Sequence, residues 1–435
     1  MLAGVSLARD GLPDAASGGA ADPAELVPRN ALVYVHVSLD TRRDPVRRLA
    51  DAASRFPSYV EQRDRIVSRL ASPDCGRAKV ALRTASDAGF ALFERQAGSG
   101  VSLLLIEQEG RAGGDRRRCG ALYAENIGDW LAIGQRPALD IARRLEADRS
   151  RSLAELPIHR DQRDRLPETR AVDGWVSAAG VRRVLAPQSG LLGLIGAIVD
   201  QPRLRGIAFS AGASETGAAV ALRNSLGSSG GRPANGDVGE LVGDIPDGAL
   251  AVAAVPRLGS SLVRLSGAGG EQVGSALGAL PRDVVALFDR PTVVTLRPAT
   301  PAPVMTITAK TDDEAAARRA LSRMPADVRR AFPSRVAGGT VVLATRRSGL
   351  RDPGEERLTS TRQWQATLGE DPAGAGSSLL FLDFTKLLAL AAQTGLDSDP
   401  AFRSAREDLR RLIAAGARIE PGAGESTVDL SLLIP

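Results

Sequence analysis

Two similar apolar stretches, roughly half the chain apart, organise this sequence. The first, LVPRNALVYVHVSLD, runs from Leu26 to Asp40, and the second, LVGDIPDGALAVAAV, runs from Leu241 to Val255. In each, a turn containing proline precedes a run of mainly apolar residues, and this pattern predicts one buried central strand. The recurrence predicts that the chain consists of two related halves.

The first half, residues 26–224, alternates helical and extended patterns. Runs rich in β-branched and apolar residues predict strands near Val80 and at 90–93, 101–106, 122–125, 130–133, 172–176, 204–210 and 218–222. Helical spacing and helix-start signals predict helices that begin near Asp44, Ser58, Pro137, Leu153, Ala178 and Leu191.

The second half, residues 238–435, repeats this order. It predicts strands at 249–255, 292–297, 304–308, 340–344, 379–382 and 426–433. Predicted helices lie at 258–265, 273–288 and 405–414, with one more from Thr311 to Met324 and one ending at Ala391. The expected fold is therefore α+β, with two lobes, each a mainly antiparallel sheet covered by helices.

Residues in matching positions support a tandem duplication. The offset between matching residues is 218 for Pro28 and Pro246, 212 for Ala132 and Ala344, 206 for Val176 and Leu382, and 210 for Glu215 and Glu425. The predicted domains are a disordered tether (1–25), a first repeat (26–224), a Gly/Ser-rich linker (225–237) and a second repeat (238–435). The helix from Thr311 has no counterpart in the first repeat, where a Gly/Arg loop (107–119) stands instead.

Composition narrows the class of protein. Hydrophobic residues make up 43% of the 435-residue chain, enough for a sizeable core, while aromatic residues make up 3%. The formal net charge is +5, from 56 basic and 51 acidic residues. Positive and negative charges are mixed locally, as in RDQRDRLPETR at 160–170, and few aromatics are present for stacking on bases, so the sequence argues against nucleic-acid binding.

The two cysteines, Cys75 and Cys119, lack metal-ligand spacing. They are either buried thiols or one possible disulfide. A bridge would close a 44-residue loop, would contribute about 4 kcal/mol in the chain-entropy model, and would imply an oxidising compartment.

The amino terminus has the form of a tether. A short apolar stretch, residues 1–7, precedes DGLPDAASGGAADPAE. Either an upstream membrane anchor is missing because translation was assigned from an internal Met, or the terminus is simply disordered. The most apolar helix candidate, Leu191–Val199, is half the length of a membrane span and predicts a core helix.

Candidate chemistry is sparse, and the sequence predicts no catalytic, cofactor or metal site. Of the two histidines, His36 lies within a predicted strand and His159 in a charged helix, where a surface position is expected. Asp40 and Asp383 follow strands, where either an active-site acid or a helix cap is possible. The triple arginine 116–118 predicts either a contact for acidic groups or a solvated loop.

Several segments together resemble a bacterial family known as domain of unknown function 3352. They are the tether, the P-x-x-AL strand that ends in Asp40, ENIGDWLAIGQ at 125–135, LPETRAVDGWVSAAGVRRVL at 166–185, and DGALAV, GGTVVLAT and LLFLDFTKLL in the second half. The resemblance implies an extracytoplasmic protein with an amino-terminal anchor, which this chain lacks. It carries over no catalytic residue.

The leading functional hypothesis is a non-enzymatic extracytoplasmic binding or scaffold protein of the bacterial envelope. Its partner would be an unknown envelope ligand or protein, and it would contact the membrane only through a missing amino-terminal anchor. One alternative is a carboxylate-dependent hydrolase that uses Asp40 and Asp383. Another is a carrier of an apolar ligand, with the Leu191 helix as a lid.

Overall fold

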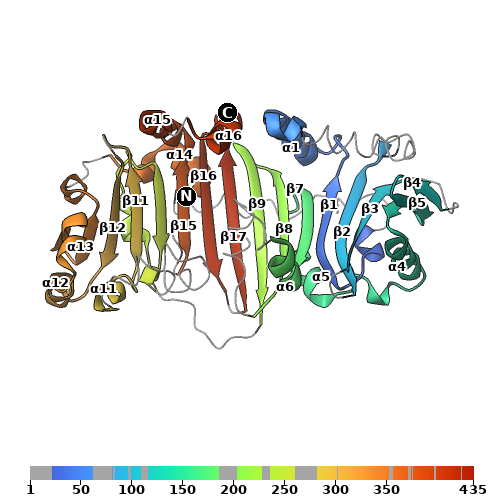
Figure 1. Cartoon of the computed structure of the whole chain (residues 1–435), viewed down its shortest axis with the longest axis horizontal. Coiled ribbons are helices and arrows are strands. Elements are labelled where there is room, and N and C mark those ends of the chain that lie inside the picture. Colours follow the sequence, from blue (N-terminus) through green and yellow to red (C-terminus); the bar gives the residue numbers. More distant parts are fainter. Residues whose placement is uncertain are drawn as a thin grey trace, which may run out of the picture. The chain divides into compact units, whose positions relative to one another are not determined.

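The protein is an α+β fold dominated by antiparallel strands, as predicted (Figure 1). The computed structural model describes residues 22–435 except for 62–80, 82–83, 97–98, 109–115, 186–202, 228–235, 260–281, 301, 352–355, 371–373, 375, 396–397 and 423. It divides into two compact units. Unit 1 takes the described residues up to His36 and those between Arg69 and Pro157, and unit 2 takes the rest.

Unit 1 contains a sheet with the strand order β1-β2-β3-β6-β5-β4. The strands are β1 (Ala31–Ser38), of which the part up to His36 belongs to this unit, β2 (Asp87–Gln96), β3 (Ser99–Glu107), β4 (Arg117–Cys119), β5 (Leu122–Ile127) and β6 (Trp130–Gly134). The helical segments are η1 (Pro23–Leu26), α4 (Arg136–Ala147) and η3 (Arg149–Arg151).

Both faces of the unit 1 sheet are apolar, because side chains alternate between faces along each strand. On one face, α4 packs against β3, β5 and β6, and its inward residues Ala138, Leu139 and Ala142 are fully buried. Leu103 and Leu105 of β3 belong to this face and are buried as well. The other face carries a separate cluster that consists of Ala81, Ile106, Cys119, Leu131 and Ile133.

Unit 2 contains an antiparallel sheet with the strand order β7-β8-β9-β17-β16-β15-β10-β11-β12-β14-β13. Its strands are β7 (Arg170–Ser177), β8 (Leu204–Ala213), β9 (Gly217–Leu226), β10 (Ala251–Val255), β11 (Thr292–Arg297), β12 (Val304–Lys310), β13 (Ser334–Ala337), β14 (Thr340–Ala344), β15 (Ser378–Asp383), β16 (Ala414–Pro421) and β17 (Glu425–Leu433). Strands β9 and β17 join the two halves of the sequence through a nine-residue ladder.

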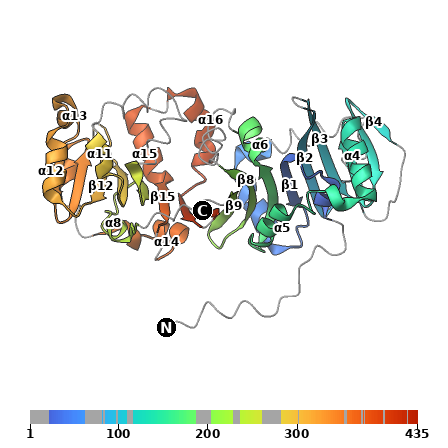
Figure 2. The ribbon, with the colours of Figure 1, turned by 90° about the horizontal axis from the view of Figure 1, so that it is seen from below.

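The helical segments of unit 2 lie on both faces of this sheet (Figure 2). They are α1 (Asp44–Ser54), α5 (Pro157–Asp164), α6 (Ala178–Gly180), η4 (Val181–Leu185), α8 (Gly239–Gly243), α11 (Arg282–Leu287), α12 (Glu314–Ser322), α13 (Ala326–Ala331), η5 (Arg347–Leu350), η6 (Leu358–Ser360), α14 (Arg362–Leu368), α15 (Phe384–Thr394) and α16 (Pro400–Leu409).

Two apolar clusters hold the second half together. On one face, residues of α8 and α14 pack on β10, β11 and β15, and the ring centroids of Trp364 and Phe381 are 5.3 Å apart. On the other face, α11, α12 and α13 pack on β12 and β14 through Val284, Phe288 and Leu321. Among the described residues, η5 is the helical segment that contacts β12 and β14 on the first face.

The two halves of the sequence share their strand orders. The series β1-β2-β3-β6-β5 in the first half corresponds to β10-β11-β12-β14-β13 in the second. Likewise β7-β8-β9 corresponds to β15-β16-β17. Isolated bridges also occur in corresponding places, between Pro28 and Ser152 and between Pro246 and Arg357.

One predicted helix lies earlier in the chain than expected, and the strand after it was not predicted. The pattern at 405–414 predicted a helix, whereas α16 ends at Leu409 and β16 begins at Ala414. The sequence of β16, AAGARIEP, has only one β-branched residue and gives little local strand signal. Pairing with β15 on one side and β17 on the other overrides that weak propensity.

The predicted boundaries can be compared with the structure only in part. The tether was expected to extend to residue 25, but η1 begins at Pro23 and its Ala24 is fully buried. The first two residues of the predicted linker, Ser225 and Leu226, belong to β9. Most of the linker and the segments predicted near Val80, at 191–199 and at 260–281 lie outside the described residues.

Candidate functional site

Asp40, one of the two candidate acids, forms a local turn on the surface of unit 2. Its Oδ1 accepts hydrogen bonds from the backbone N–H of Arg42 at 3.0 Å and from the Arg42 Nε at 2.8 Å. The guanidinium of Arg42, followed by its backbone N–H, holds the pKa of the Asp40 carboxyl below its ordinary value. A carboxylate held this way stays ionised, so it cannot donate a proton as a general acid near neutral pH.

The pH dependence of this contact has a definite sign. A carboxyl with a lowered pKa stabilises the fold above its unfolded pKa, and that stabilisation is lost as the pH falls through the folded pKa. We expect Asp40→Asn to lower the urea-unfolding midpoint slightly near pH 7 and to have a smaller effect near pH 3. Asp129→Asn is the control, because Asp129 is exposed and its side chain has no partner within the described residues. An equal effect of Asp40→Asn at both pH values would contradict the assignment.

Asp383, the other candidate acid, is the N-cap of α15. Its Oδ1 accepts a hydrogen bond from the backbone N–H of Lys386 at 3.0 Å, and its Oδ2 lies 3.4 Å from the Lys386 Nζ. The Nζ also donates to the carbonyl of Asp247 at 2.5 Å. The capping interpretation of Asp383 is therefore confirmed, and each of the two carboxylates has its own cationic partner.

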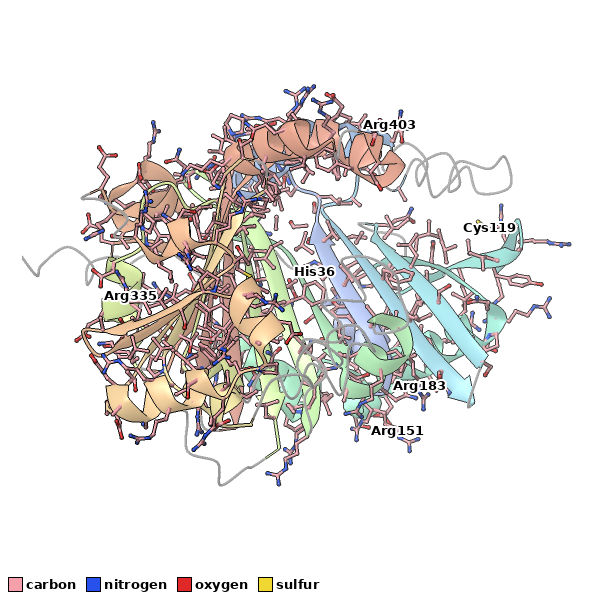
Figure 3. The ribbon with its side chains drawn as sticks, turned by 60° about the vertical axis from the view of Figure 1, so that its left-hand side comes forward. His36, Cys119, Arg151, Arg183, Arg335 and Arg403 are labelled. Atoms are coloured by element: carbon pink, nitrogen blue, oxygen red, sulfur yellow. The ribbon has the colours of Figure 1, made fainter. Side chains whose placement is uncertain are left out.

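His36 lies in a strand, as predicted, whereas His159 does not lie at the surface. His36 is half-buried on β1, and its Nε2 lies 2.9 Å from the Oδ1 of Asp87 on β2 (Figure 3). His159 was expected at the surface, but it is 2% exposed and meets Trp175 edge to face at 5.7 Å. The surface expectation for His159 was wrong because His159 and Gln162, three residues apart, share the inward face of α5.

Of the two cysteines, Cys119 lies buried at the end of β4 (Figure 3). Cys75 lies outside the described residues. A bridge between Cys75 and Cys119 therefore stays a prediction.

The triple arginine divides between an internal role and an exposed one. Arg117 and Arg118 are exposed on β4, whereas the Nε of Arg116 lies 2.7 Å from Oε2 of Glu125 on β5. The Glu125 carboxylate also pairs with Arg143 of α4. The Nη2 of Arg116 lies 2.6 Å from Oδ1 of Asp140, which also belongs to α4. Arg116 thus links β5 of the unit 1 sheet to α4, the helix that covers it.

A hollow of about 260 Å³ lies on the first face of the unit 2 sheet. We call it the arginine hollow. Its lining residues are Leu241, Asp244, Ile245, Pro246, Val293, Thr295, Arg297, Thr306, Thr308, Arg335, Thr340, Val342, Gly349, Arg351 and Arg357.

The floor of the arginine hollow follows from strand register. Thr295 of β11 lies opposite Thr306 of β12, and Thr308 lies opposite Val293 on one side and Val342 on the other. Since alternate residues share a face, these side chains all point to the same side. Thr295 and Thr306 are buried, and their hydroxyls hydrogen-bond to each other.

Four arginines lie around the rim of the arginine hollow. Arg297 stands at the end of β11 and Arg335 on the edge strand β13 (Figure 3). Arg351 follows η5, and Arg357 precedes η6. One acidic residue, Asp244, is present beside these four arginines. The lining therefore combines hydroxyl groups below with guanidinium groups above.

Among the described residues, the segment that follows the fourth matching strand differs between the two units. In unit 1, the segment after β6 is α4, a twelve-residue helix that covers β3, β5 and β6. In unit 2, the corresponding segment after β14 is η5, a single turn of four residues. Gly349 of η5 lies so near the sheet that a Cβ would come within 2.8 Å of the side chains of Ala344 and Val304. In the part of the chain that the structure describes, this face of β12 carries Thr306 and Thr308, and both line the hollow.

The arginine and threonine side chains of the hollow can bind a ligand but are unsuited to transfer protons. Arginine guanidinium groups remain protonated at all ordinary pH values, and threonine hydroxyls donate or accept hydrogen bonds without titrating. Within the described residues, no cluster of three or more His, Cys, Asp or Glu could hold a metal ion. Sequence reasoning missed the arginine hollow because Arg297, Arg335 and Arg351 are up to 54 residues apart and only the sheet brings them to one face.

Comparisons of the sequence with known proteins identify no family for this chain. No family model matches the chain, and no curated protein matches it either. Of the described residues, no helix is long and apolar enough to cross a membrane.

Among solved structures, similar chains include crystal forms I, III and IV of TP0453. Form I has 13% identity and a TM-score of 0.27, and it covers 49% of this chain and 82% of that one. Forms III and IV have 12% identity and TM-scores of 0.26 and 0.27; they cover 49% and 47% of this chain and 83% and 81% of theirs. Likenesses this low carry no argument about fold or function, and the resemblance to domain of unknown function 3352 stays a prediction.

Proposed function

We propose that this chain is a non-enzymatic, extracytoplasmic binding protein of the bacterial envelope, built from two tandem-duplicated lobes, and that the arginine hollow is its ligand site. The observation that carries this proposal is the open sheet face under η5, where the corresponding face of unit 1 is closed by α4. A polar hollow on an otherwise covered sheet is a usual place for a small ligand.

The duplication is supported by strand order and by register. Both halves use the same sequence of strand pairings, and β9 pairs with β17 so that Val220 lies opposite Leu430. These two residues are 210 positions apart, the same offset as Glu215 and Glu425. Two copies joined about a local twofold axis would place equivalent residues opposite each other in this way.

The non-enzymatic part is supported by the partners of the candidate acids. Asp40 is ion-paired with Arg42, and Asp383 caps α15 beside Lys386. Retaining and inverting glycosidases need one carboxylic acid with a raised pKa beside a second carboxylate. The pKa of the Asp40 carboxyl is shifted the opposite way, downward.

The extracytoplasmic part is supported by the tether composition, by the resemblance to an anchored envelope family and by the possible disulfide. Fractionation of cells that produce the natural protein is expected to find it in the envelope or outside the cytoplasmic membrane. Recovery in the cytosolic fraction alone would refute this part of the proposal.

A thermal-shift screen of neutral, cationic and anionic small molecules tests the binding function. We expect at least one compound to raise the unfolding temperature of the native chain and of Met305→Leu, whose change lies on the opposite face of β12. The same compound should have no effect on Thr308→Leu, which fills the hollow with a larger apolar side chain.

Two results would contradict the proposal. One is a screen in which no compound shifts the unfolding temperature. The other is hydrolysis of glycoside or ester substrates by the native chain, with loss of that activity in Asp40→Asn, which would instead support the carboxylate-dependent hydrolase.

A further inference from the structure

Part of the positive charge around the arginine hollow has no counter-charge among the described residues. Arg297, Arg335 and Arg351 make no side-chain hydrogen bond or ion pair within the described residues. Across the sheet, Arg318 pairs with Glu314 at 2.6 Å, and Arg323 pairs with Asp283 at 2.9 Å.

Burial makes this imbalance costly. Arg297 is half-buried at the end of β11 rather than extended into solvent. Partial removal of a guanidinium from water carries a desolvation penalty unless hydrogen bonds and an opposite charge compensate it. Several guanidinium groups around one hollow also repel one another. An anion in the hollow would relieve both effects.

The geometry of the donors narrows the kind of anion. A guanidinium presents a planar fork of N–H groups that matches two oxygens of a carboxylate, phosphate or sulfate. The half-buried Thr308 adds a hydroxyl from the floor, and it makes no side-chain hydrogen bond within the described part of the chain. A volume of about 260 Å³ is below the range of about 300–1,000 Å³ for drug-sized ligands. It suits a small molecule or the charged end of a larger one.

Resting on the function proposed above, we propose that the ligand is a small oxyanion with two or more negative charges: a phosphate ester, a sulfate ester or a polycarboxylate. Arg297, Arg335 and Arg351 bind its oxygens, and Thr308 donates a hydrogen bond from the floor. Among the described residues that line the hollow, none is aromatic, so no aromatic ring is present there to stack on a nucleobase.

Isothermal titration calorimetry at constant ionic strength tests whether the chain binds a small oxyanion. The probes are pyrophosphate, glucose 1,6-bisphosphate, a disulfated disaccharide and citrate, with glucose as the neutral control. We expect saturable binding of at least one polyanion with a stoichiometry of one, and no binding of glucose. The polyanion that binds most tightly distinguishes a phosphoryl, a sulfuryl and a carboxylate source.

Matched charge variants locate the site. Arg335→Gln and Arg351→Gln, both exposed, should each raise the dissociation constant about tenfold or more, since a charge-assisted hydrogen bond contributes that much to affinity. Arg323→Gln removes the same charge from the opposite face and should change it less than about twofold.

Three results would overturn the inference. Equal weakening by Arg323→Gln and Arg335→Gln would mean non-specific attraction to the basic chain. The absence of polyanion binding, together with a neutral or cationic ligand whose binding is blocked by Thr308→Leu, would leave the binding function intact but refute the ligand class. The absence of any ligand would refute both.

Discussion

Replacement of Phe381 by alanine is expected to lower the free energy of unfolding by about 3–5 kcal/mol. Phe381 is 2% exposed and packs against Trp364 in the cluster that joins α8, α14 and β15. Its removal loses the transfer free energy of a buried ring and leaves a cavity, because the flanking strands β10 and β16 hold the backbone in place.

The adjacent residue provides a close control. Leu380 lies on the same strand but points to the other face, and it is 42% exposed. Leu380→Ala should cost less than about 1.5 kcal/mol, because its side chain gives up little burial on unfolding. Urea unfolding followed by tryptophan fluorescence measures both. Similar losses for the two variants would mean that the faces of β15 have been assigned wrongly.

Replacement of Glu125 by glutamine is expected to destabilise unit 1 by about 3 kcal/mol. The Glu125 side chain is fully buried and is paired with Arg116 and Arg143. Without its charge, the guanidinium groups of Arg116 and Arg143 lose the anionic partner that they share. Removal of one member of a buried ion-pair network usually costs more than the network contributes as a whole, since it strands the remaining charges.

Asp140→Asn is the matched control for Glu125. Asp140 belongs to the same network through Arg116, but its side chain is 51% exposed. Its loss should cost at most about 1 kcal/mol. Hydrogen exchange of the β5 and α4 amides, compared with those of β15, localises the effect to unit 1. Equal protection of β5 and α4 in the native chain and Glu125→Gln would contradict the assigned role.

The contrast between the two halves has a simple physical origin. In unit 1 the face under α4 carries Leu103 and Leu105, which need an apolar cover. In unit 2 the corresponding face carries Thr306 and Thr308, which can meet either water or a ligand. Once such a face is polar, a covering helix gains little from packing on it, so a single turn suffices.

Local sequence patterns were informative wherever a segment buries one face. The strands β11 and β14 run over the residues predicted, because their β-branched residues give a strong signal. The helix α4 begins one residue before the predicted Pro137, which confirms the helix-start signal. The capping interpretation of Asp383 was also confirmed, since a cap depends on residues three positions apart.

By itself, the sequence determined the α+β class, most of the strands and the matching order of elements in the two halves, because these depend on side-chain periodicity and local propensity. The tertiary structure alone decided that Ala414–Pro421 is a strand, that β9 pairs with β17, that His159 is buried and that Arg297, Arg335 and Arg351 share one rim. Each of these depends on which distant segment lies alongside, and strand pairing is a long-range interaction that local patterns do not encode.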